Sequence, residues 1–239
     1  SLLSAGCHSP MHSRLKSVLE RRPTDKVSCA DAHVHSSSVR STLHFGSSMQ
    51  ILVKDHPSVE IPEGSTARDL AQKLHKPEPG QALAAVINGT TRDLSTVLQP
   101  GDHVELLDFQ DPRGKEVFWH SSAHILAQAV LRLFPDAKPT IGPPIEQGFY
   151  YDFANLPIGE EDLSRIEQEM EKIVGENAKP HREILEDKAT AKEVFGSNPY
   201  KVELIEGFPE DAPLSAYRQG EFFDLCRGPH LPSLGRVRG

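Results

Sequence analysis

The order of short apolar runs between residues 49 and 107 constrains the fold more than any other feature of this sequence. The pattern predicts two strands joined by a tight turn, then one helix behind the N-cap candidates Ser65 and Thr66, then two further strands. These elements cover residues 49–54, 58–62, 66–76, 84–87 and 104–107. The order predicts a small ubiquitin-like β-grasp domain over residues 49–110, in which one sheet packs against one helix.

A second pattern begins at Lys115, after a break at residues 111–114 that contains a proline and a glycine. Apolar spacing predicts helices over residues 117–134, 160–176 and 189–195. Runs of strand character cover residues 149–153, 181–185, 201–205 and 222–225. This mixture predicts an α+β domain over residues 115–239, with an antiparallel sheet and a long helix.

Residues 1–48 have a different composition, which is rich in Ser and His, and their apolar residues show no lasting periodicity. We expect a disordered or linker-like extension, with a short helix near residues 11–20. An organelle transit peptide is the alternative, because such peptides are rich in Arg and Ser. The acidic residues Glu20, Asp25 and Asp31 argue against it.

Composition excludes some classes of protein. No apolar run approaches the 18 residues or more of a membrane span, so we expect no membrane association. The net charge of −8 argues against a free-standing nucleic-acid binder, but it permits a module that meets RNA beside a basic neighbour. The cysteines, at positions 7, 29 and 226, are too few and scattered for a disulfide scaffold. A reducing compartment fits best, and we expect the cytoplasm, with the mitochondrial or plastid matrix as the alternative.

Four residues form the strongest candidate for chemistry. His120 and His124 lie four apart on a predicted helix, so their side chains share one face. Cys226 and His230 flank Gly228 and Pro229, which break regular structure and place the pair on a loop. One helix and one loop thus offer three imidazoles and a thiol to a common cavity.

This inventory has three interpretations. The residues can be structural, with hydrogen-bonded core histidines and a buried cysteine. They can bind Zn²⁺, for which histidine and cysteine are good ligands. They can also form a metal-free hydrolytic site, in which neutral imidazoles hold and activate water.

Ordered motifs carry a resemblance to one family. Glu63-Gly-Ser-Thr66, Val86-Ile-Asn-Gly89 and Leu98-Gln-Pro-Gly-Asp102 resemble the accessory TGS domain of threonyl-tRNA synthetases and some GTPases. His120-Ser-Ser-Ala-His124, Pro139-Thr-Ile-Gly-Pro143, Gly148-Phe-Tyr-Tyr-Asp152, Tyr200-Lys201 and Asp224-Leu-Cys-Arg-Gly-Pro-His230 resemble the editing domain of bacterial and organellar threonyl-tRNA synthetases. Order and spacing match over residues 115–232.

The resemblance implies hydrolysis of serine from tRNA(Thr). It assigns His120, His124, Cys226 and His230 to the central cluster, and Tyr151, Lys201 and Asp224 to the polar residues around it. A histidine and Tyr151 would orient water. Lys201 would stabilise negative charge or hold the tRNA end, and Asp224 would orient a neighbour or the substrate ammonium. A similar cluster holds zinc in alanyl-type editing proteins, whereas the threonyl type is thought to need no cofactor; the ligand set suits both.

Nothing in the sequence resembles the aminoacylation motifs of the family. We therefore expect the amino-terminal piece of a longer homodimeric synthetase, with an editing domain truncated at its carboxyl end. ATP and Mg²⁺ would be needed only by the absent aminoacylation domain. The rival hypotheses are a free-standing deacylase that edits in trans, and a non-catalytic RNA- or ribosome-associated module.

Overall fold

The structure is a computed structural model that describes residues 47–74 and 82–238. The linker-like extension predicted for residues 1–48, with its short helix, lies outside these ranges except for Ser47 and Ser48. Ser48 already belongs to the first strand. None of the helices within the described ranges is long and apolar enough to cross a membrane.

The first part of the described chain is the β-grasp fold that the sequence predicts. Its elements are β1 (Ser48–Val53), β2 (Val59–Pro62), α2 (Ala67–Lys73), β3 (Ala84–Ile87), β4 (Thr90–Arg92) and β5 (His103–Leu107). The sheet order is β2-β1-β5-β3-β4, with β1 parallel to β5 and the other neighbours antiparallel. Leu70 of α2 packs into one buried cluster with Ile51 and Val104 of the sheet.

Local chemistry explains where α2 begins. The Thr66 side chain accepts a hydrogen bond from the Asp69 backbone, and the Asp69 carboxylate accepts one from the Thr66 backbone, which forms a capping box. Thr66, rather than Ser65, is therefore the N-cap. The helix was predicted to reach residue 76, and residues 75 and 76 lie outside the described ranges. The three-residue strand β4 was not predicted, because it is too short to show alternation.

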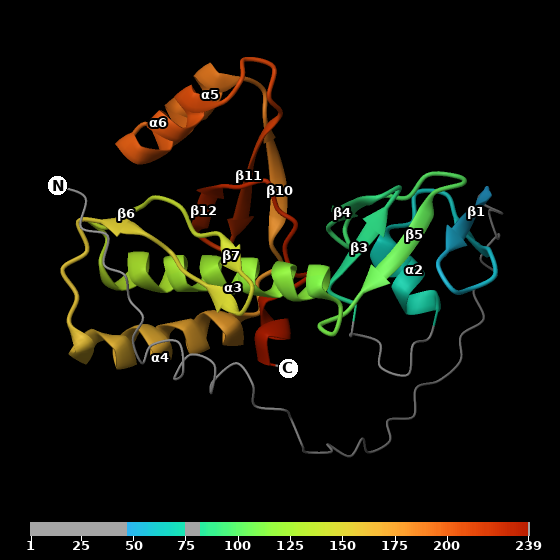
Figure 1. Ribbon diagram of the computed structural model, residues 1–239, viewed down its shortest axis with the longest axis horizontal. Helices are drawn as coiled ribbons and strands as arrows, with labels where there is room; N and C mark the ends of the chain where they lie inside the picture. Colours follow the sequence, from blue (N-terminus) through green and yellow to red (C-terminus); the bar gives the residue numbers. More distant parts are fainter. Residues whose placement is uncertain (1–46, 75–81, 239) are drawn as a thin grey trace, which may run out of the picture.

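Helices α3 (Pro112–Leu133) and α4 (Glu160–Glu176) lie side by side and carry the core of the second part (Figure 1). Ile125 of α3 packs with Ile166 and Ile173 of α4. Helix α3 starts five residues before the predicted position. Asp111 caps it and proline occupies the first turn, where the missing N–H costs nothing. The predicted break at residues 111–114 is therefore the first turn of this helix.

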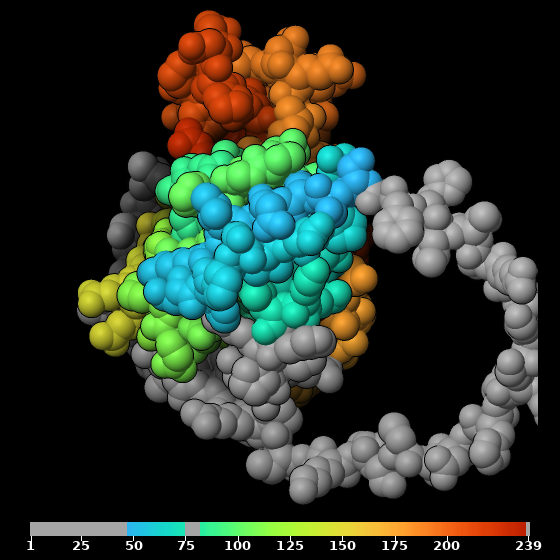
Figure 2. Space-filling model, turned by 90° about the vertical axis from the view of Figure 1, so that its right-hand side faces the viewer, coloured from blue at the N-terminus to red at the C-terminus, as the bar shows by residue number. Residues whose placement is uncertain are grey.

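The predicted antiparallel sheet has three strands in the order β10-β11-β12. They are β10 (His181–Leu185), β11 (Leu214–Gln219) and β12 (Phe222–Leu225). Strand β11 was not predicted, because most of its residues are buried and its sequence shows no polar alternation. Helices α5 (Lys188–Phe195) and α6 (Pro199–Gly207) project away from the rest of the molecule, as two perpendicular views show (Figures 1 and 2).

The strand predicted over residues 201–205 is wrong, because these residues lie within α6. Asn198 caps the helix and Pro199 begins it, and the buried residues Lys201 and Ile205 are four apart, which is helical spacing. Apolar residues at positions 202 and 204 imitated a strand. This correction moves Lys201 from the start of a strand to the inner face of a helix.

The strand predicted over residues 149–153 is split in two. Strand β8 (Gly148–Phe149) pairs with β7 (Pro144–Ile145), and β9 (Phe153–Ala154) pairs with β6 (Lys138–Pro139). Tyr151 lies between the two pairs. The chain ends, within the described residues, in the short 3-10 helix η1 (Leu234–Arg238), which packs on α4.

Candidate functional site

The structure brings together the four residues that the sequence singles out. The ring centroid of His230 lies 4.3 Å from that of His120 and 4.2 Å from that of His124. The sulfur of Cys226 lies 3.2 Å from Nε2 of both His120 and His230. One ligand atom from each residue can be chosen so that all four lie within 4.8 Å of one another. Helix α3 supplies the first pair of histidines one turn apart, and the loop after β12 supplies the cysteine and the third histidine.

Backbone conformation lets this loop turn inward. Gly228 has a φ of +68°, which favours glycine, and a Cβ there would lie 2.0 Å from the hydroxyl oxygen of Tyr217. The Gly228 amide donates to the sulfur of Cys226 at 3.3 Å. From α3, the Ser121 hydroxyl accepts from the Leu231 amide at 2.9 Å and lies 3.1 Å from Nδ1 of His230. The loop is thus fastened on both sides of Pro229.

Burial keeps the cluster uncharged. Desolvation lowers the pKa of His120 to about 4, opposed by the hydrogen bond that its ring donates to the Pro229 carbonyl. It lowers the pKa values of His124 and His230 well below the ordinary value, with a further contribution from neighbouring histidines. Burial raises the pKa of the Cys226 thiol to about 12. At neutral pH the site therefore holds three neutral imidazoles and a protonated thiol.

Three further predicted residues form a polar arm beside the cluster, in which Lys201 and Asp224 are buried and Tyr151 is partly buried. Nζ of Lys201, from α6, lies 2.6 Å from Oδ1 of Asp224 in β12. The Tyr151 hydroxyl donates a short hydrogen bond to the same carboxylate. Burial, together with the negative charge of Asp224, raises the pKa of Tyr151 well above its ordinary value, so the phenol stays protonated. The charge of Lys201 also lowers the pKa of His124, which links the arm to the cluster.

The donor set suits zinc. Ligand atoms around a tetrahedral zinc ion are roughly 3.3–3.8 Å apart, given bond lengths of about 2.0–2.3 Å. The sulfur–nitrogen distances of 3.2 Å are close to this range, and Nδ1 of buried His124 has no hydrogen-bond partner in the described part of the chain. Four protein ligands would, however, close the coordination shell, whereas a hydrolytic zinc keeps one position open for water. The geometry therefore fits a metal ion and a metal-free water site alike.

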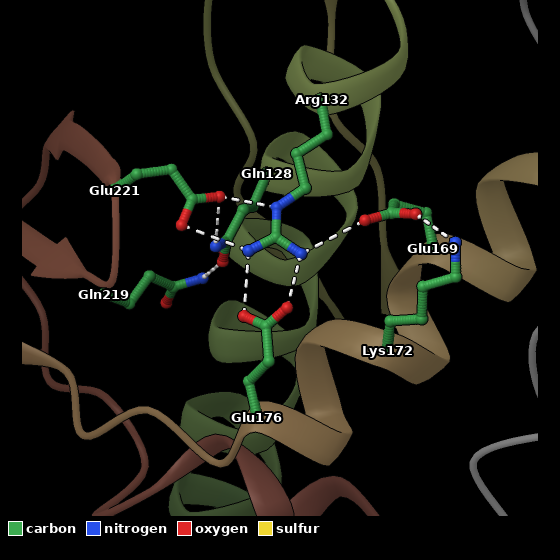
Figure 3. Close-up of polar contacts among 7 residues, drawn as sticks. All are labelled: Gln128, Arg132, Glu169, Lys172, Glu176, Gln219 and Glu221. Atoms are coloured by element: carbon green, nitrogen blue, oxygen red, sulfur yellow. Dashed lines mark hydrogen bonds and ion pairs between the residues drawn. The ribbon is translucent and has the colours of Figure 1, made fainter.

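A polar network connects the two elements that lead to the site residues, helix α3 and the β11–β12 hairpin (Figure 3). Arg132 bonds Glu221, at the turn between β11 and β12, with Nε 2.5 Å from Oε1. The same guanidinium reaches Glu169 and Glu176 of α4 at 3.1 and 2.7 Å. Gln128 donates to Glu221 at 2.9 Å. Helix α3, which carries two of the histidines, is thereby tied to the hairpin that leads to Cys226.

Sequence reasoning missed three residues that support the cluster. Ser121 lies within the histidine motif, and its position next to His120 was a signal. Tyr217 belongs to the unpredicted strand β11. Asp93 lies in the β-grasp fold and accepts from the His230 amide at 2.8 Å and from the Tyr217 hydroxyl at 2.6 Å. No local sequence pattern predicts a contact between two residues that lie 137 positions apart.

Comparisons with known proteins show two domain matches and a set of similar enzymes. A TGS domain model matches residues 49–108, and the threonyl and alanyl tRNA synthetase second additional domain matches residues 214–239. The threonine–tRNA ligase of Protochlamydia amoebophila is 59% identical over 80% of this chain and 29% of its own length. That of Chlamydia trachomatis is 54% identical over 75% of this chain and 28% of its own length. That of Caldanaerobacter subterraneus is 44% identical over 80% of this chain and 30% of its own length.

The chain thus spans about three tenths of the length of the curated relatives it matches. Identity of this order over most of the sequence, together with the two domain matches, makes this chain a homologue of the threonine–tRNA ligases.

Proposed function

We propose that the cluster of His120, His124, Cys226 and His230 hydrolyses the ester that joins serine to tRNA(Thr). The observation that carries the proposal is the meeting of three neutral imidazoles and a thiol with the polar arm of Lys201, Asp224 and Tyr151. The match to the second additional domain of threonyl and alanyl tRNA synthetases supports the same substrate class. Serine and threonine differ by one methyl group, which a single binding pocket discriminates by only about 1–3 kcal/mol. A second site that admits serine and excludes threonine supplies the remaining accuracy.

The chemistry needs a positioned water and an acceptor for its proton. A neutral imidazole carries one lone pair that can accept a proton, and His120 is the only histidine of the cluster that is partly exposed. We therefore assign it to the water, which would share its Nε2 with the Cys226 sulfur. The water oxygen forms a bond to the ester carbonyl carbon, and its proton passes to the imidazole. The proton then moves to the departing ribose oxygen, which leaves free serine and tRNA.

The polar arm would interact with the charged groups of the substrate and of the reaction. The Asp224 carboxylate, which contacts Lys201 and Tyr151, would attract the ammonium group of the seryl ester. Lys201 carries a buried positive charge near the cluster, where it would stabilise negative charge that develops on the carbonyl oxygen. If three of the four residues held zinc and left one position open, the metal would polarise that oxygen or lower the pKa of a bound water.

The test is release of labelled amino acid from Ser-tRNA(Thr) and Thr-tRNA(Thr), with and without a chelator. We expect faster release of serine than of threonine, and loss of release in His120→Ala and Lys201→Met. The matched control is His103→Ala, which removes an exposed histidine of the β-grasp fold. Unchanged serine release in His120→Ala would remove that residue from the mechanism. Inhibition by the chelator, reversed by Zn²⁺, would select the metal-dependent mechanism.

We further propose that the chain acts as part of a threonine–tRNA ligase that attaches threonine to tRNA(Thr). Its relatives carry that name, and they are more than three times as long as the matched region. Activation of threonine with ATP and Mg²⁺, and assembly into a homodimer, would depend on segments outside this sequence. The bacterial relatives support a cytoplasmic location.

A further inference from the structure

We propose that Asp93, in the TGS-like part of the chain, is a positioning residue for the candidate site. Its carboxylate would hold the loop of Cys226 and His230 in the geometry that hydrolysis needs. This inference rests on the proposed function of that site, but it adds a role for a domain regarded as an accessory. The experiment below separates a failure of one from a failure of the other.

Both carboxylate oxygens of Asp93 accept hydrogen bonds from residues of the second part of the chain. Oδ1 accepts from the backbone amide of His230 at 2.8 Å, and Oδ2 accepts from the hydroxyl of Tyr217 at 2.6 Å. The residue itself follows β4 in the β-grasp fold, where only its backbone carbonyl takes part in the local turn, by accepting from Thr96 at 3.0 Å. The side chain therefore serves the neighbouring part rather than its own.

Through its hydrogen bond to Tyr217, Asp93 also supports the same loop indirectly. Tyr217 is 1% exposed, and its ring centroid lies 4.5 Å from that of His230. Its hydroxyl oxygen lies where the Cβ of any other residue at position 228 would be. By fixing this hydroxyl, Asp93 also fixes the surface against which Gly228 packs.

His230 is thus held from two directions. Ser121 of α3 lies 3.1 Å from its ring nitrogen Nδ1, on the side of the cluster, and Asp93 holds its backbone amide from the β-grasp side. At the far end of the loop, a guanidinium nitrogen of Arg68 donates to the carbonyl of Pro232 at 3.3 Å. Contacts from the β-grasp fold therefore reach both His230 and the residues that follow it.

Loss of the carboxylate would leave the His230 amide and the Tyr217 hydroxyl without an acceptor. A hydrogen bond to a charged acceptor is stronger than one between neutral groups, and an unpaired buried donor is costly. The loop would then relax away from the imidazoles of α3. Because misplacement of catalytic groups by about 1 Å costs roughly 100-fold in rate, we expect Asp93→Ala to lower kcat by about 10- to 100-fold with a smaller change in KM.

The test uses the full chain and four variants. Asp93→Asn keeps one acceptor oxygen, so its loss should be smaller than that of Asp93→Ala, and Tyr217→Phe should show a partial loss of the same kind. Asp102→Ala is the matched control. Asp102 is a buried carboxylate of the same fold, and among the described residues its side chain bonds only within that fold, to Asn88 and to the Gln99 amide at 2.8 and 2.7 Å. It therefore reports the effect of a weakened β-grasp fold without a lost contact to the loop.

Two quantities are measured for each variant: kcat and KM for serine release, and the hydrogen–deuterium exchange rate of the His230 amide. We expect Asp93→Ala, but not Asp102→Ala, to lower kcat and to speed exchange at His230 by at least tenfold. Wild-type values in Asp93→Ala would overturn the proposal, as would faster exchange with unchanged kcat. An equal loss of kcat in Asp102→Ala would also overturn the proposal, because the loss would then come from a weakened β-grasp fold. If the wild-type chain releases no serine, the proposed function fails, and exchange at His230 alone decides whether Asp93 positions the loop.

Discussion

Nζ of Lys201 lies 2.6 Å from Oδ1 of Asp224, and each side chain is only 4% exposed. A buried ion pair contributes little net stability when intact, because desolvation of both charges offsets their attraction. Removal of one partner is different, since it strands the other charge in the interior. The pair therefore makes the polar arm sensitive to single substitutions.

Lys201→Met should lower the free energy of unfolding by about 3–5 kcal/mol, because Asp224 would remain buried without its cation. Urea denaturation at pH 7 measures this loss. The double variant Lys201→Met/Asp224→Asn should recover most of it, since both charges are gone and the amide oxygen still accepts from Tyr151. A single variant within about 1 kcal/mol of wild type would show that water reaches the pair.

Gly228→Ala should disturb the loop severely. The added Cβ would meet the Tyr217 hydroxyl at 2.0 Å, and the backbone there has a φ of +68°. Strain and overpacking together should cost about 2–5 kcal/mol. Thermal melting measures the loss, and Gly207→Ala is the control, because a Cβ at Gly207 meets nothing within 4 Å. Equal melting temperatures for the two variants would contradict the packing described for the loop.

Substitutions of His120 and His124 should affect hydrolysis and stability differently. His124 is 3% exposed and packs against Phe222, so His124→Ala should leave a cavity and lower the melting temperature by several degrees. His120 is less buried, so His120→Ala should leave melting within a few degrees of wild type. Serine release in His120→Ala should nevertheless fall by roughly 100- to 10,000-fold if it acts as the base. The reverse pattern would exchange the roles of the two histidines.

Acid should weaken the Arg132 network. The hydrogen bond from Arg132, aided by Gln128, lowers the pKa of Glu221 to about 2 from its ordinary value of 4.5. A lowered pKa in the folded chain means that the charged carboxylate stabilises the fold fully above about pH 4.5, and that this stabilisation disappears as the pH falls towards 2.

The difference in urea midpoint between wild type and Arg132→Met should accordingly be largest near pH 6 and shrink between pH 4.5 and 2. Arg165→Met is the control, since it removes an exposed arginine of α4 whose partner is Asp162 rather than Glu221. A difference that stays constant across this range would mean that Arg132 stabilises the fold through packing and not through Glu221.

Much of the architecture could be predicted from local patterns. Apolar runs and turn residues located every strand of the β-grasp sheet except β4, and helical spacing located α4. The pairing of His120 with His124 and of Cys226 with His230 needed only residue spacing. These features depend on neighbours in sequence, which is what such patterns record.

The failures occur where the local pattern is weak, misleading or absent. Strand β11 is buried through most of its length, so it lacks the alternation of a half-exposed strand. In α6 the apolar residues beside Lys201 alternate as in a strand, and only the cap at Asn198 and the burial of Ile205 identify a helix. Asp93 gives no signal at all, because its partners belong to another part of the fold.

The histidine pair and the Arg132 network lie on one row of residues that slants around α3. His120, His124, Gln128 and Arg132 follow one another at intervals of four residues. A helix advances by about 100° per residue, so one inserted or deleted residue between them would swing one end of this line away from the hairpin while the other end stayed in place. The chemistry at one end and the anchor at the other are therefore held at a fixed angle about the helix axis, and only insertions or deletions of about one turn, three or four residues, would nearly keep that angle.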